Sequence, residues 1–179
     1  MTLRERLEVV GIVALTVISL GLGSRAMLSG PRSVEGADMF HLEIASVDLT
    51  SGPRTTAFTA SGMAPGDTVT IAITVANSGR NPMAFGMSRG EVSPGGSALA
   101  DALILTIKTV GSSCADFNGV TLSEGPLAEA AFGNQTDGQP LPAATAQILC
   151  FRAVLPLDTG NELQGAATTV SLSFQARAL

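Results

Sequence analysis

Residues that could perform catalysis or bind a metal are few in this sequence of 179 residues, and they form no recognisable motif. The only histidine, His41, lies between Phe40 and Leu42 in a run typical of a β-strand. A hydrolase needs a nucleophile with a base, or a metal with its ligands, and zinc sites usually take several ligands from histidine or cysteine. One strand histidine without an HExxH motif therefore favours a protein that is not an enzyme, and we expect no catalytic residues.

Carboxylates are the remaining candidate metal ligands. Calcium prefers oxygen ligands from loops, and the acidic residues that could supply them are Asp48, Asp67, Asp116, Asp137, Asp158 and Glu162. Aspartates in turns, however, more often accept hydrogen bonds from their own backbone. We therefore expect no metal site and no cofactor, with Ca²⁺ as the one ion that the residue types leave open.

Residues 1–26 have the features of an export signal. Charged residues at positions 4–8 precede the uncharged stretch VVGIVALTVISLGLG, which has about 15 residues, whereas a membrane-spanning helix needs roughly 20. Ser24 and Ala26 supply the small residues that favour cleavage between Ala26 and Met27. The alternative is a retained membrane anchor. In both cases we expect the rest of the chain to be secreted or held at the cell surface, touching the membrane only through residues 1–26 if these stay uncleaved.

Export bears on the two cysteines, because disulfides persist in oxidising compartments. Cys114 lies in the polar loop GSSCADFNG, and Cys150 lies in the apolar strand AQILCFRAVLP. The sequence allows a disulfide between them, which would contribute roughly 3 to 4 kcal/mol in the chain-entropy model. The alternative is a buried Cys150 that packs as a small hydrophobic residue and an unrelated thiol in the loop.

The elements that would position these residues are predicted to be strands. Of all residues, 45% are hydrophobic, 14% charged and 4% aromatic, which suits many short strands better than long charged helices. The net charge of −5 argues against a nucleic-acid partner. The clearest strand, residues 68–76, alternates apolar and polar residues after the turn APGD, in which Gly66 is expected to adopt a positive φ.

The same reading predicts further strands along most of the chain. They cover residues 40–49, 55–60, 82–88, 103–109, 120–122, 147–155 and 170–174, with single helical turns near 98–102 and 161–165. We therefore predict an all-β protein, an antiparallel β-sandwich of jelly-roll, Greek-key or Ig-like type, over residues 39–179. An N-terminal hydrophobic signal or anchor helix (1–26) and a flexible segment (27–38) would precede it.

Two stretches resemble a known family. The segments GMAPGDTVTIAITVANSG and LPLDTGNELQG are similar to segments of the TasA/camelysin family of secreted bacterial proteins, which build surface and biofilm-matrix fibres. The resemblance extends over nearly all of residues 20–176. The sequence departs from the family at Met27 to Gly30, where an F-x-D motif is usual, and at Ser123, where tyrosine is common.

The resemblance implies a structural function. Copies of the protein would form a homopolymer, in which residues 27–38 of one subunit add a strand to the sheet edge of the next, together with envelope or matrix components. Some camelysin-like members are classed as metallopeptidases, so that a secreted metallopeptidase is one alternative. A membrane-anchored cell-surface domain that binds a partner without polymerising is the other.

Overall fold

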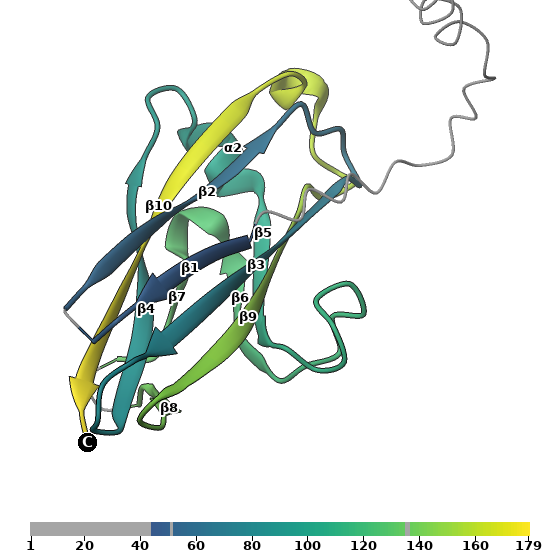
Figure 1. The fold of residues 1–179 in the computed structure, drawn as a ribbon. Coiled ribbons are helices and arrows are strands. Elements are labelled where there is room, and N and C mark those ends of the chain that lie inside the picture. Colours follow the sequence, from purple (N-terminus) through teal and green to yellow (C-terminus); the bar gives the residue numbers. More distant parts are fainter. Residues whose placement is uncertain (1–43, 51, 135–136) are drawn as a thin grey trace, which may run out of the picture. The chain divides into compact units, whose positions relative to one another are not determined.

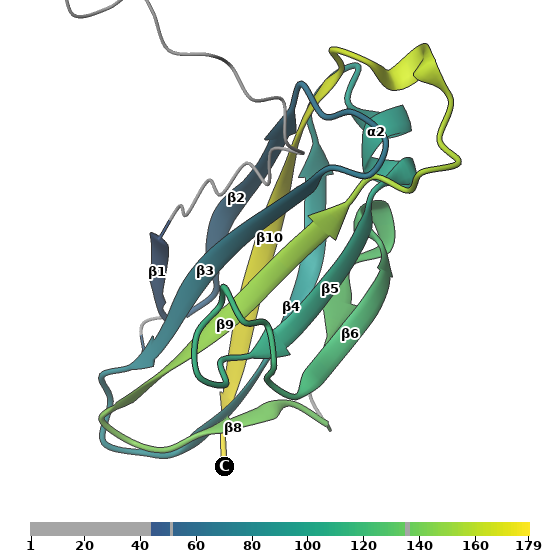
Figure 2. The same cartoon turned by 90° about the vertical axis from the view of Figure 1, so that its right-hand side faces the viewer.

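Alternation of apolar and polar residues along the strands produces two facing β-sheets. The computed structural model describes residues 44–50, 52–134 and 137–179, all of which belong to one compact unit spanning Gly36–Leu179. Figures 1 and 2 show the two sheets of this unit from directions 90° apart. The all-β sandwich predicted from the sequence is therefore confirmed, whereas the expected N-terminal helix lies outside the described residues.

The first sheet has β9 at its centre. In the described part of the chain its strand order is β1-β3-β9-β5-β6. The strands are β1 (Ile44–Asp48), β3 (Thr68–Asn77), β9 (Thr145–Val154), β5 (Ile104–Thr109) and β6 (Thr121–Pro126). β3 and β9 are paired along their whole length, from Thr68 opposite Val154 to Asn77 opposite Thr145.

The second sheet is built around β10. Within the described residues its order is β2-β10-β4-β7, and β8 also pairs with β4. The strands are β2 (Arg54–Ser61), β10 (Ala167–Ala178), β4 (Met83–Val92), β7 (Ala131–Phe132) and β8 (Gln139–Leu141). Short helical segments lie between strands: α2 (Ser97–Ala102) and the 3-10 turns η1 (Leu127–Glu129) and η2 (Asn161–Leu163).

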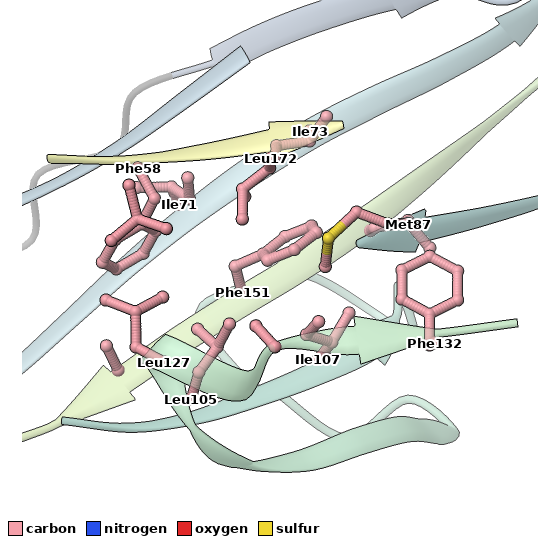
Figure 3. Packing of buried hydrophobic residues seen from close by; sticks show 14 of the residues in the cluster. Phe58, Ile71, Ile73, Met87, Leu105, Ile107, Leu127, Phe132, Phe151 and Leu172 are labelled. Carbon is pink, nitrogen blue, oxygen red and sulfur yellow. The ribbon is translucent and has the colours of Figure 1, made fainter. Parts of the chain in front are cut away.

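The core lies between the two sheets and is filled by the inward-facing residue of each alternating pair. Ile73, Phe151 and Leu172 are fully buried there, and Figure 3 shows them packed among residues of both sheets. The rings of Phe151 on β9 and Phe174 on β10 meet edge to face across the interface, with centroids 6.5 Å apart. Such aromatic pairs add about 0.5 to 1.5 kcal/mol to the effect of area burial.

The turn before β3 has the geometry expected from its sequence. Gly66 has φ +94°, and Asp67 N donates to Ala64 O at 2.9 Å. The Asp67 carboxylate accepts a hydrogen bond from Ala64 N at 2.8 Å. Pro65, Gly66 and Asp67 are therefore explained by the turn itself, since only glycine readily adopts that φ.

Two features differ from the predicted antiparallel sheet. β1 pairs with β3 in parallel, from Ile44 opposite Ala72 to Asp48 opposite Ala76. β7 and β8 lie between the strands predicted at 120–122 and 147–155, where no strand was expected. Proline is tolerated at a sheet edge because no hydrogen-bond donor is required on the free side, and Pro140 lies in such a short pairing with Ala84.

Candidate binding site

The loop at residues 110–120 connects β5 to β6 and folds back over the outer face of the first sheet. Figure 2 shows it in front of β9. A disulfide joins Cys114 in this loop to Cys150 on β9, with Cα atoms 5.2 Å apart. Because β9 is the central strand, the disulfide fixes the loop to the middle of the sheet. We call residues 110–120 the anchored loop.

Strand alternation explains why Cys150 faces the loop. Leu149 and Phe151 point into the core, so Cys150 between them must point outward. It is nevertheless only 1% exposed, because the anchored loop covers it. Ala72, Cys114, Cys150 and Phe117 form a second, small apolar cluster between the loop and the sheet, with Val110 packed against it.

Phe117 is the centre of this cluster. Its backbone has φ +51°, which is unusual for a bulky residue. The Arg152 guanidinium carbon lies 4.0 Å from the centroid of its ring, and the Lys108 ammonium nitrogen lies 4.9 Å from it. Cation–π contacts of this kind contribute about 0.5 to 1 kcal/mol each where they are partly exposed. The ring therefore connects the loop to cations on β5 and β9.

The same two cations also hold the loop backbone. Arg152 donates from Nη2 to Ala115 O at 3.1 Å and from Nε to Thr70 Oγ1 at 3.2 Å. Lys108 Nζ donates to Phe117 O at 3.3 Å. Both side chains come from outward positions of neighbouring strands, so the sheet itself sets their spacing.

The tip of the anchored loop is closed by polar side chains. Asp116 accepts hydrogen bonds from Ser112 Oγ at 2.7 Å and Ser113 Oγ at 2.8 Å. These bonds, that from Ser112 first, hold the pKa of the Asp116 carboxyl below its ordinary value of 3.8. Asn118 Oδ1 accepts from Ser112 N at 3.1 Å. The loop is thus cross-linked at its tip, its centre and its base.

An exposed apolar side chain lies beside the loop. Ile148 on β9 is 40% exposed and occupies the outward position two residues before Cys150. Its carbonyl accepts a hydrogen bond from Val110 N at 3.0 Å, so that Ile148 borders the base of the loop. We define the loop face as the anchored loop together with Ile148, Lys108 and Arg152. It contains the exposed apolar side chains of Val120 and Ile148 and the charged groups of Asp116, Lys108 and Arg152. Surfaces of such mixed polarity are common among protein interfaces.

The structure brings together two of the residues singled out in the sequence, Cys114 and Cys150. Ala26, Met27 and His41 lie outside the described residues. The carboxylates considered as calcium ligands do not converge: in the described part of the chain, no group of three or more His, Cys, Asp or Glu could hold a metal ion.

Three of those carboxylates instead accept local hydrogen bonds. Asp67 accepts one in the turn before β3, and Asp116 closes the anchored loop. Asp48 accepts from Thr50 N at 2.9 Å, from Thr50 Oγ1 at 2.7 Å and from Ser78 Oγ at 2.7 Å. The hydroxyl of Ser78, followed by that of Thr50, keeps the pKa of Asp48 well below its usual range.

Lys108, Arg152 and Ile148 were not identified from the sequence. Each occupies an outward position on a strand that was predicted correctly, so strand alternation could have placed Lys108 and Arg152 on the face of Cys150. What the sequence did not show is that the loop folds back over this face rather than extending into solvent.

No helix among the described residues has the length and hydrophobicity that crossing a membrane requires.

No protein-family model matches this chain, and no curated protein does. The similar solved structures include two periplasmic lysozyme inhibitors of g-type lysozyme. PliG of Aeromonas hydrophila is 9% identical, with 75% of this chain and 98% of that chain covered and a TM-score of 0.37. PliG of Salmonella Typhimurium is 13% identical, with 74% and 98% covered and a TM-score of 0.33. These values do not identify the family of this chain.

The assignment to the TasA/camelysin family was wrong. No family model matches the chain, and the two solved structures named above are lysozyme inhibitors rather than fibre proteins. The resemblance misled because the matching residues form local structures that unrelated proteins share. Pro65, Gly66 and Asp67 make a turn that any β-protein can use. Asn77 holds the chain reversal after β3 by donating to Asn81 O and accepting from Gly79 N. The homopolymer, the fibre function and the metallopeptidase inferred from that family are corrected with it.

Proposed function

We propose that the protein is an exported binding domain that engages a partner protein through its loop face. The observation that carries this proposal is the anchored loop, which a disulfide, two cations and a hydrogen-bonded tip hold on the outer face of the sheet. Binding residues often lie on loops that a rigid scaffold positions. A loop that is already ordered loses little conformational entropy when a partner binds, which favours affinity.

The chemistry of the loop supports binding rather than catalysis. Within the anchored loop, the hydroxyl groups of Ser112 and Ser113 are hydrogen-bonded to a carboxylate, since both donate to Asp116. A serine nucleophile needs a base that accepts its proton. The hydrogen bonds that lower the pKa of Asp116 also make it a weaker base than an ordinary aspartate. The serine and aspartate side chains are therefore better explained as supports of the loop tip.

Export is the second part of the proposal. The disulfide between Cys114 and Cys150 is typical of proteins from oxidising compartments. Residues 1–26 are proposed as the export signal or membrane anchor, with cleavage after Ala26 in the first case, and residues 27–38 as the segment before the sandwich. A jelly-roll, Greek-key or Ig-like topology remains the finer proposal for residues 39–179.

The test places a photo-crosslinking amino acid at Ile148 in cells that export the protein. The matched control carries the same amino acid at Ala57, which is exposed on β2 of the other sheet. We expect one partner protein to be crosslinked from position 148 and not from position 57. In a second experiment, both crosslinking variants are mixed with purified g-type lysozyme, the protein inhibited by the two PliG proteins. Crosslinks of equal yield from both positions, or none from either, would refute the proposal.

A further inference from the structure

The outer face of the second sheet contains a hollow of about 260 Å³ between β4, β10 and the segment that follows β7. It lies on the other sheet from the loop face and is independent of the proposed function. Its polar lining comes from Ser88, Asn134, Ser173, Gln175 and Arg177, and Gly86 contributes to its apolar part.

The pairing of β4 with β10 explains why a hollow forms. Directly opposite pairs share one face of the sheet, and the outward pairs here are Ser88 with Ser173, Gly86 with Gln175 and Ala84 with Arg177. β4 thus contributes small residues, whereas β10 contributes Gln175 and Arg177, which are long and polar.

Gly86 is essential to this arrangement. A Cβ atom at this position would lie 2.7 Å from Gly133 O and 2.9 Å from Phe132 O. Only glycine therefore lets the 132–133 backbone approach β4 so closely. That backbone forms one side of the hollow, and Asn134 follows it directly.

The charges of the hollow select an anion. None of the described residues that line it is a carboxylate, although the whole chain has a net charge of −5. Arg177 forms no side-chain hydrogen bond or ion pair with the part of the chain that the structure describes. Its guanidinium has a planar fork of donors that matches a carboxylate. One cation surrounded by neutral amides and hydroxyls suits a ligand with a single negative charge.

The size and the apolar lining restrict the ligand further. A hollow of about 260 Å³ lies just below the usual range for small-molecule sites, which is roughly 300 to 1,000 Å³. Ala84, Ala176 and Gly86 offer apolar contact beside Arg177, while Ser88, Ser173 and Gln175 can bind an amide group. We propose that this hollow binds the carboxylate of an N-acylated small amino acid, either as a free molecule or as the C-terminal residue of a peptide.

The experiment follows backbone amide shifts by NMR in the full chain during titration. The probes are N-acetyl-L-alanine, a tetrapeptide ending in alanine, and the same tetrapeptide with a C-terminal amide. We expect saturable shifts of residues 86–88, 133–134 and 173–177 with the two carboxylates and none with the amide. Tighter binding of the tetrapeptide would identify a peptide end as the ligand, and equal binding would identify the free molecule.

Arg177→Gln should weaken binding about tenfold or more, because it removes the charge-assisted hydrogen bonds. Arg177→Lys should restore only part of the affinity, because lysine cannot form the planar bidentate contact. Arg80→Gln is the matched control, since Arg80 is also exposed but does not line this hollow, and it should change affinity less than about twofold. The proposal is overturned by absence of saturable shifts with both carboxylates, by equal shifts with the amide, or by an unchanged affinity in a folded Arg177→Gln variant.

Discussion

Removal of the disulfide with the double substitution Cys114→Ala and Cys150→Ala should lower stability by an amount that follows from the chain length it spans. The two cysteines are separated by 36 residues. In the chain-entropy model, closing a loop of that length contributes about 4 kcal/mol at 25 °C. For a domain of this size, we expect the melting temperature to fall by roughly 8 to 16 °C.

The variant should still fold, because Arg152 and Lys108 keep their contacts with Phe117. These cation–π contacts are worth only about 0.5 to 1 kcal/mol each, so the anchored loop should open locally more often than the sheet beneath it. Hydrogen exchange would detect this as faster exchange at residues 112–118 than at the centre of β9. Urea unfolding of the same sample gives the global loss.

Wild-type protein in reductant is the matched control and should unfold at the same urea concentration as the double mutant, while reductant should leave the mutant unchanged. A loss of less than about 1 kcal/mol would show that the unfolded chain is not restricted by the disulfide. Equal acceleration of exchange in the loop and in β9 would show that the loop is not a separate unit.

Three further substitutions test other parts of the argument. Thr168 is 1% exposed and its hydroxyl has no hydrogen-bond partner among the described residues. Thr168→Val should therefore raise the free energy of unfolding by about 1 kcal/mol, as measured in urea. A lower free energy of unfolding would show that the hydroxyl is hydrogen-bonded in the wild-type protein. Gly66→Val should cost about 1 to 3 kcal/mol, because Gly66 has φ +94° and a Cβ would lie 2.8 Å from Leu157 Cδ2; an unchanged thermal melt would contradict the turn assignment. Hydrogen bonds from Ser112 and Ser113 lower the pKa of Asp116 in the folded state below 3.8, so its contribution to loop stability is complete above that pH and is lost as the pH falls below it. After correction for intrinsic rates, hydrogen exchange at the anchored loop should therefore be constant from pH 7 to 5 and should accelerate below about pH 3.8. Asp116→Asn should remove that acid dependence.

The strands could be predicted from the sequence wherever one face is buried. Ile71 and Ile73 alternate with threonine and alanine on β3, and both are buried as the pattern required. The turn at Gly66 was predicted correctly because its conformation depends on neighbours in the sequence. β8 was missed because its pairing with β4 depends on an edge position that the sequence of Gln139–Leu141 does not reveal.

The two candidate sites illustrate what local patterns cannot provide. Arg152 and Phe117 are 35 positions apart in the sequence, and their contact exists only because the anchored loop folds back over β9. The hollow depends likewise on the register that places Gln175 opposite Gly86. Neither the direction of a loop nor the register of distant strands follows from the alternation of apolar and polar residues. The local motifs that suggested a family are common to many β-proteins.

The order of the strands along the chain determines when the protein can fold, which matters for the export that we propose. β2 pairs with β10, so that Ala60 lies opposite Thr168 although more than a hundred positions separate them. Loop closure over such distances is slow, and sheets built from distant pairs fold slowly. The first sheet cannot be completed before β9 has been synthesised, nor the second sheet before β10. We therefore expect a nascent chain that stays unfolded long enough to pass a membrane as an extended polypeptide, and that acquires its disulfide only on the far side.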